Sequence, residues 1–121
     1  MKDTKDLSRI EHHLLSMQVD DIEPLFILYA DTNRDVEGAT LELILKALVK
    51  LARFGLSQVY IVDTKYKLIP KITFKDLKQR FKGLPKQEWG KYPEAPEYYF
   101  EITEKGRQEE PKPEYDVYYP K

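Results

Sequence analysis

The sequence predicts an α+β domain with three or four helices and a small antiparallel sheet, and three observations support this prediction. Residues 41–54 form the longest amphipathic stretch of the chain, with Thr40 before it and Gly55 after it. Two short segments, 58–63 and 98–102, contain the β-branched and aromatic residues that are typical of strands. A chain of 121 residues is long enough to bury one core around these elements.

The first helix is expected over residues 9–17. Ser8 and Glu11 match a capping box, in which the two residues satisfy each other's backbone amides at the start of a helix. Ile10 and Leu14 are about one turn apart, so they place an apolar face toward the core.

A second helix is expected over the apolar segment 22–30. Pro24 would lie in its first turn, where a missing amide hydrogen costs little. The polar residues 31–38 predict a loop. Thr40 then caps the long helix over 41–54, which should be the centre of the core.

The chain is less regular over residues 63–97. Thr73 and Asp76 repeat the capping-box pattern and predict a short helix that ends near Phe81. The proline-containing residues 84–97 predict a loop.

The C-terminal part begins with the strand at 98–102. Thr103 offers a hydroxyl as an N-cap, and Glu104 places a negative charge in the first turn of a short helix. Two prolines then predict the end of regular structure. We therefore expect one domain over residues 1–110 and an extended tail over residues 111–121.

The element order over residues 20–107 resembles the winged helix-turn-helix superfamily. In that family a recognition helix commonly ends in Gly-Leu and runs into a wing strand, and the second wing strand often ends in Thr-x-x-Gly-Arg. The matching residues are Leu48, Leu51, Gly55, Leu56, Val59–Val62, Thr103, Gly106 and Arg107. The resemblance implies a winged-helix-like fold that binds nucleic acid and takes part in transcription.

The sequence departs from the family pattern in two places. No Gly, Pro or Asn interrupts residues 41–54, so the helix reads as continuous, without the tight turn that precedes a recognition helix. The connection between the wing strands is about 35 residues long and contains its own helix, whereas a hairpin loop usually has about 2–5 residues.

The net charge of −1 conceals a strong partition along the chain. Residues 1–64 carry a net charge of −4, and residues 92–121 also carry −4. Residues 65–91 contain nine Lys or Arg against two Asp or Glu, a net charge of +7. Nucleic acid binding needs cations along a surface, because phosphate contacts release counterions and supply most non-specific affinity.

The candidate nucleic-acid contacts lie on the polar face of the long helix and in the basic segment. They are Lys46, Lys50, Arg53, Lys65, Lys67, Lys71, Lys75, Lys78, Arg80 and Lys82. Such contacts would be directed at the backbone rather than at bases. The alternative interpretation is a solvated lysine-rich surface that pairs with the acidic parts of the same chain.

A protein-interaction or homodimer-forming module is the alternative function. The acidic first part of the chain and the missing turn favour a domain that kept the winged-helix scaffold without reading DNA. The C-terminal third also holds amphipathic rings that could contact a partner, and the other interpretation is that they pack on the domain itself. These residues are Tyr92, Tyr98, Tyr99, Tyr115, Tyr118 and Tyr119.

A calcium loop at residues 31–42 is a minor alternative. Asp31, Asn33, Asp35 and Glu42 stand at positions 1, 3, 5 and 12 of an EF-hand-like loop. Val36 occupies the position where the sharp turn of that loop requires Gly, which favours a polar loop between helices.

The composition provides no catalytic or cofactor pattern. Cysteine is absent, which excludes disulfides and thiolate sites and favours a cytoplasmic location. His12 and His13 are adjacent, so on a helix they point about 100° apart and do not converge on one metal ion; a packed or boundary position is expected for His13. No nucleophile motif, Gly-rich phosphate loop, signal-peptide core or long apolar run occurs. We therefore expect a non-enzymatic binding module without cofactor, bound metal or membrane partner.

Overall fold

The structure, a computed structural model, describes residues 7–62, 65–81 and 97–119. These residues form an α+β fold, as predicted, with six helices and a four-stranded antiparallel sheet. The helices are α1 (Arg9–Met17), α2 (Leu25–Asp35), α3 (Leu41–Arg53), α4 (Phe74–Phe81), α5 (Glu104–Glu109) and the 3₁₀ helix η2 (Pro113–Tyr118). The strands are β1 (Glu23–Pro24), β2 (Ser57–Val62), β3 (Tyr66–Ile69) and β4 (Glu97–Ile102).

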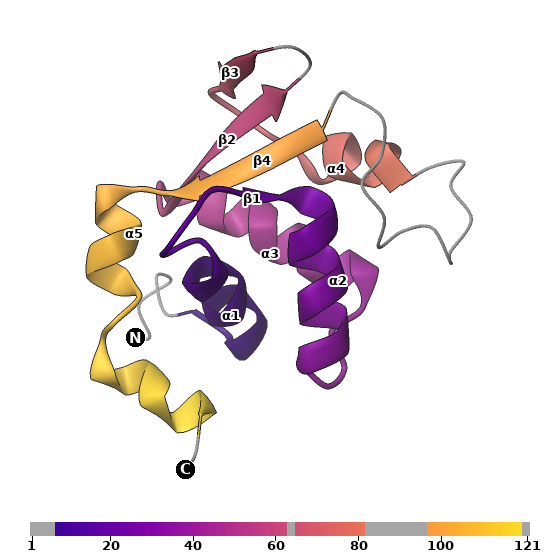
Figure 1. Cartoon of the computed structure of the whole chain (residues 1–121). Coiled ribbons are helices and arrows are strands. Elements are labelled where there is room, and N and C mark those ends of the chain that lie inside the picture. The colour runs from indigo at the N-terminus through magenta and orange to yellow at the C-terminus, as the bar shows by residue number, and fades with distance from the viewer. Residues whose placement is uncertain (1–6, 63–64, 82–96, 120–121) are drawn as a thin grey trace.

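The sheet has the strand order β1-β4-β2-β3, so the last strand in the sequence lies between β1 and β2. Val59 pairs with Phe100, and both side chains are buried. Tyr60 pairs with Tyr99 on the opposite face, because successive residues of a strand alternate between faces. Helices α1, α2 and α3 lie together on one side of the sheet (Figure 1).

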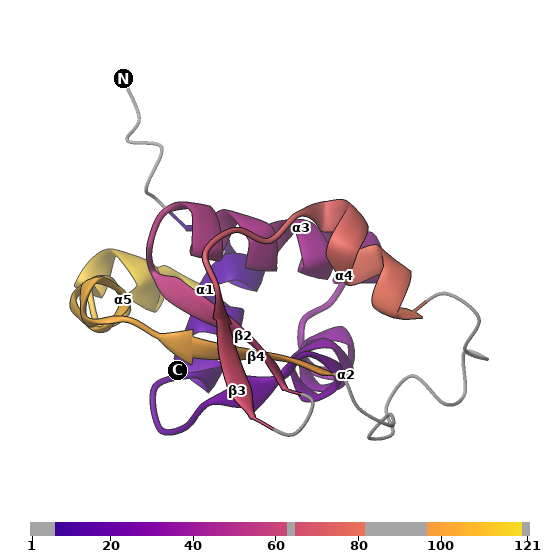
Figure 2. The same cartoon turned by 90° about the horizontal axis from the view of Figure 1, so that it is seen from above.

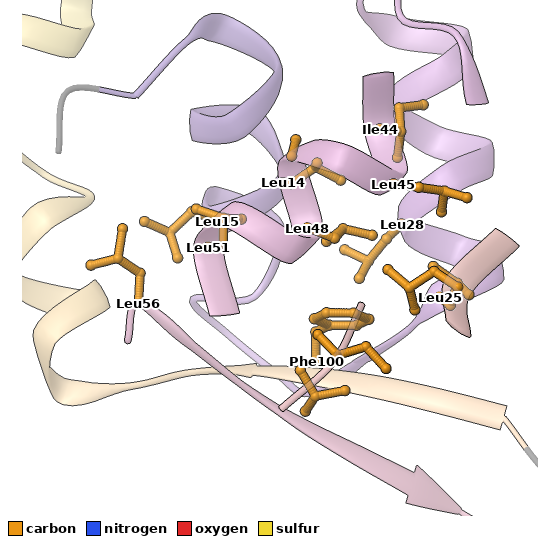
Figure 3. Packing of buried hydrophobic residues seen from close by; sticks show 14 of the residues in the cluster. Leu14, Leu15, Leu25, Leu28, Ile44, Leu45, Leu48, Leu51, Leu56 and Phe100 are labelled. Atoms are coloured by element: carbon orange, nitrogen blue, oxygen red, sulfur yellow. The ribbon is translucent and has the colours of Figure 1, made fainter. Parts of the chain in front are cut away.

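The core lies between this helical layer and the sheet. Leucine side chains of α1, α2 and α3 converge on one another and on the Phe100 ring of β4 (Figure 3). Leu14, Leu28, Leu48 and Phe100 are each fully buried. Burial of apolar surface at this junction is the main force that holds the three helices against the sheet.

Three of the predicted helix starts are confirmed by their hydrogen bonds. Ser8 and Glu11 form the complete capping box at the start of α1. The Thr40 hydroxyl oxygen accepts from the amide of the third residue of α3, at 3.2 Å. Thr73 and Asp76 exchange side chain–backbone bonds of 3.1 Å at the start of α4.

The C-terminal end of α3 is closed by residues from the far end of the chain. Gly55 has a φ of +76°, which lets the chain leave the helix in the left-handed conformation. The Thr103 hydroxyl donates to the Gly55 carbonyl oxygen, and its amide donates to the Leu56 carbonyl oxygen at 3.0 Å. Lys105 Nζ donates to the Phe54 carbonyl oxygen at 2.8 Å. The Gly-Leu and Thr-x-x-Gly-Arg segments are therefore two halves of one packing unit.

The strands expected at 58–63 and 98–102 are confirmed, with β2 over Ser57–Val62 and β4 over Glu97–Ile102. The long helix is continuous, as predicted. The loop expected at 31–38 is wrong over its first half, because α2 continues to Asp35. Buried Thr32 holds this last turn of α2 against the core, which outweighs the turn preference of its polar neighbours.

The break between the second and third helices therefore lies before Thr40. Residues 36–40 connect α2 to α3, and Gly38 adopts a φ of +80° in this turn. Residues 41–53 contain no turn, in agreement with the continuous helix expected there.

Three further elements differ from expectation. The helix expected over 22–30 begins at Leu25, because Glu23 and Pro24 form the short strand β1, which pairs with β4. Strand β3 was not predicted, although Tyr66 and Leu68 alternate with polar residues; it pairs with β2 as a hairpin. The tail expected to be extended forms η2, which begins at Pro113 and buries Tyr115. Lys82, Tyr92 and most of the loop expected at 84–97 lie outside the described residues.

Candidate nucleic-acid interface

A groove of about 680 Å³ separates the C-terminal half of α3 from the β2–β3 hairpin and the segment 70–74. Val49 and Ala52 line it from α3, and Ile69 and Phe74 line it from the opposite wall. Seen from above, the chain leaves β3 and runs back along α3 to reach α4 (Figure 2). The groove is thus built from the long helix and from the long connection between β2 and β4.

Basic side chains reach this groove from several elements. Arg53 of α3 and Lys71 of the connection line it. Lys67 of β3 is exposed and does not line the groove; it lies next to Leu68, which does.

Phe74 brings two more cations together. Lys46 Nζ of α3 lies 5.6 Å from the centre of the Phe74 ring, and Lys78 Nζ of α4 lies 5.7 Å from it. A cation over an aromatic face is held by the ring quadrupole. Lys46 also forms an exposed ion pair with Glu42, at 3.3 Å, so its charge is partly compensated.

Arg53 and Lys71 are the described candidates that line the groove, whereas Lys65, Lys67, Lys75 and Lys78 are exposed outside its lining. Among the described residues, none of these six cations forms an ion pair. Exposed cations without a carboxylate partner are available to an anionic ligand.

Lys50 and Arg80 are directed away from the groove. Lys50 Nζ lies 2.9 Å from the Glu11 carboxylate of α1 and packs beside Phe54. Arg80 Nε lies 3.4 Å from the Glu97 carboxylate, and its guanidinium stacks over Phe26. Both residues hold elements of the fold together.

Glu97 explains why Arg80 points inward. Its side chain is buried, and burial raises the pKa of this carboxyl, against the opposing effect of the Tyr98 amide and of Arg80. The Tyr98 amide donates to Glu97 Oε1 at 2.8 Å, whereas Glu97 Oε2 is buried without a hydrogen-bond partner among the described residues. The cation beside this carboxylate therefore offsets only part of the cost of its burial.

Helix α4 covers part of α3 but leaves its polar face open. Leu77 of α4 is fully buried, whereas Glu42, Leu43 and Lys46 near the start of α3 are exposed. Glu42 and Lys46 pair with each other, and Lys50 pairs with Glu11. Among the described cations of α3, Arg53 at the groove is therefore the one without an ion pair.

The adjacent histidines form hydrogen bonds with other elements of the fold. His12, the more buried of the two, lies with Nδ1 2.8 Å from Tyr119 Oη and donates from Nε2 to the Glu110 carbonyl oxygen. His13 is half-buried, as expected for a boundary position, and its Nδ1 lies 3.0 Å from Thr32 Oγ1. Burial lowers the pKa of His13.

The tyrosines divide between core and surface. Tyr115 stacks on His12, and the Tyr118 hydroxyl donates to the Leu7 carbonyl oxygen at 2.8 Å, so the tail rings cover α1. On the outer face of the sheet, Tyr66 contacts the rings of Tyr60 and Tyr99 and is 57% exposed. This exposed aromatic cluster includes residues that the sequence interpretation did not single out.

The calcium loop is contradicted by the conformation of its ligands. Asp31, Asn33 and Asp35 belong to helix α2, where residues two apart point in different directions. Both aspartates pair with Arg34, and Glu42 pairs with Lys46. Among the described residues, no group of three or more His, Asp or Glu side chains could hold a metal ion.

The chain matches no protein-family model, no curated protein and no solved structure. In the part of the chain that the structure describes, no helix is long and apolar enough to cross a membrane.

Proposed function

We propose that this chain is a non-enzymatic, winged-helix-like domain that binds the sugar–phosphate backbone of nucleic acid. One observation carries the proposal: cations separated along the sequence border a single groove. Arg53 and Lys71 line it, Lys46 and Lys78 meet at the lining residue Phe74, and Lys67 lies on β3 next to the lining residue Leu68. Phosphate contacts of this kind supply affinity without sequence readout.

The order of elements supports the winged-helix part of the proposal. Helices α2 and α3 are joined by the five residues 36–40, as in a helix-turn-helix unit, and α3 leads into β2 through Gly55. Strand β4 pairs with β2, and Thr103, which follows β4, forms a hydrogen bond with Gly55 at the end of α3. The β2–β3 hairpin would then be the wing, with the α4 segment as an insertion after it.

Titration of the protein with a labelled duplex and a labelled single strand over a salt series tests the proposal. If five cations contact phosphates, log K for the duplex should fall with log salt at a slope of roughly −4 to −5. The double variant Arg53→Glu/Lys71→Glu should weaken duplex binding at least about tenfold at low salt, with a shallower slope. Both side chains are exposed, so the variant should keep its fold.

The control is Arg9→Glu, compared with the single variants Arg53→Glu and Lys71→Glu, which change the net charge by the same amount. Arg9 is exposed on α1, and its electrostatic neighbours His13 and Tyr119 lie away from the groove. This variant should bind as the wild type does. Duplex and single-strand binding that is absent at low salt would contradict the proposal, and equal loss in the control would contradict the assignment of the site.

An interaction module is the second candidate, and the exposed rings on the outer face of the sheet favour it. Tyr66 and Leu68 are 57% and 54% exposed, and large aromatic side chains are common anchors of protein interfaces. A mass that rises with protein concentration, together with no nucleic-acid binding, would support this candidate.

A further inference from the structure

The groove beside α3 has a second chemical character besides its charge. Its walls are largely apolar, with Val49 and Ala52 facing Ile72 and Phe74. Val59 and Ile72 at its floor are almost fully buried. Among the described residues that line it, none is Asp or Glu, and Arg53 and Lys71 are its two cations. An apolar cleft with two cations and no carboxylate suits a ligand that is apolar along most of its length and anionic at one end.

Most of the other polar side chains of the groove already form hydrogen bonds. The Ser57 hydroxyl donates to Gln18 Oε1 at 2.8 Å, and the Thr103 hydroxyl donates to the Gly55 carbonyl oxygen. Thr73 Oγ1 accepts from the Asp76 amide at the start of α4. The charged donors of the groove are Arg53 and Lys71, which form no ion pair among the described residues. The exposed side-chain amide of Gln58 is a further, neutral donor in the lining.

We propose that this groove binds a small organic carboxylate with an apolar body. The apolar part would lie between Ala52 and Phe74, and the carboxylate would accept charge-assisted hydrogen bonds from Arg53 and Lys71. A volume of about 680 Å³ is within the range of small-molecule sites.

This inference goes beyond the proposed function, because it rests on the apolar walls rather than on the spread of cations. The two ligands share Arg53 and Lys71, so they should compete. A carboxylate in the groove would neutralise the cations on which phosphate contact depends, and nucleic acid would be released.

Decanoate is the probe, measured by titration calorimetry below its micelle concentration, beside decan-1-ol and decyltrimethylammonium. Decanoate should bind one-to-one and more tightly than either. Arg53→Gln should weaken decanoate about tenfold, as expected for loss of a charge-assisted hydrogen bond, and Arg9→Gln should not. Ala52→Leu, a substitution that α-helices tolerate, should narrow the groove between Ala52 and Phe74 and weaken decanoate binding.

Three results would each overturn the inference: no saturable decanoate binding, equal affinity for decan-1-ol, or an unchanged affinity in Ala52→Leu. Oligonucleotide titrations of the same samples separate the two proposals. Duplex binding without decanoate binding overturns this inference alone, and decanoate binding without duplex or single-strand binding overturns the nucleic-acid proposal alone.

Discussion

At Gly106, close contact with the Leu56 carbonyl group leaves no room for a side chain. Gly106 lies inside helix α5, where alanine would usually be more stable than glycine by about 1 kcal/mol. A Cβ at this position would overlap the Leu56 carbonyl oxygen and lie 2.7 Å from Ile102 Cγ1. The close approach of α5 to the end of α3 therefore requires glycine for its lack of a side chain, not for its backbone freedom.

Gly106→Ala should destabilise the protein, against the trend expected from helix propensity. Overpacking against a fixed carbonyl group should lower the free energy of unfolding by about 1–3 kcal/mol, measured by urea denaturation. Lys105→Ala provides the comparison on the same helix, since it removes the bond to Phe54 without inserting atoms. A Gly106→Ala protein as stable as the wild type, or more so, would show that α5 can move away from α3.

At the scale of elements, the C-terminal part of the described chain contacts both the end of α3 and the region of α1. Thr103 caps the start of α5 through its hydroxyl oxygen, which accepts from the Gly106 amide at 3.1 Å. The same hydroxyl donates to the Gly55 carbonyl oxygen at the end of α3. Helix η2 packs its tyrosines on α1, with the Leu7 amide donating to Tyr115 Oη. These contacts join elements that are far apart in the sequence.

Thr103→Ala should cost more stability than Thr40→Ala. Thr40 caps one helix, whereas Thr103 serves two, so we expect losses of about 1 and about 2 kcal/mol in the free energy of unfolding. Both values come from parallel urea titrations. Equal losses would mean that the bond from Thr103 to Gly55 contributes nothing measurable.

At the scale of the whole molecule, neighbouring cations on α3 have different surroundings. Lys50 faces Glu11 of α1, and Arg53, almost one turn later, borders the groove. One helix thus has one basic residue that pairs with another helix and one that borders an open groove. A count of positive charges along the sequence does not distinguish the two.

We therefore expect Lys50→Gln to reduce stability and Arg53→Gln to reduce duplex affinity. Lys50→Gln should lower the free energy of unfolding by up to about 1 kcal/mol and leave duplex affinity unchanged. Arg53→Gln should leave stability unchanged, weaken duplex binding and reduce the salt slope by about 1. Unfolding and binding measured on both variants test this division, and an equal effect of the two on binding would refute it.

The sequence by itself determined the local elements of this protein. The α+β class, the continuous helix over 41–53, and the strands β2 and β4 follow from periodicity and composition within short windows. The starts of α1, α3 and α4 follow in the same way from Ser8, Thr40 and Thr73. Capping and amphipathicity act between residues three or four positions apart, so a linear sequence displays them.

Only the tertiary structure decided which charges are free and where the chain turns. Arg80 and Lys50 look like ligand contacts in the sequence, but burial of Glu97 and the position of α1 give each a partner far along the chain. The last turn of α2 and helix η2 persist because Thr32 and Tyr115 are buried. Burial and ion pairing depend on distances across the fold, and those distances exist only after the helices have packed on the sheet.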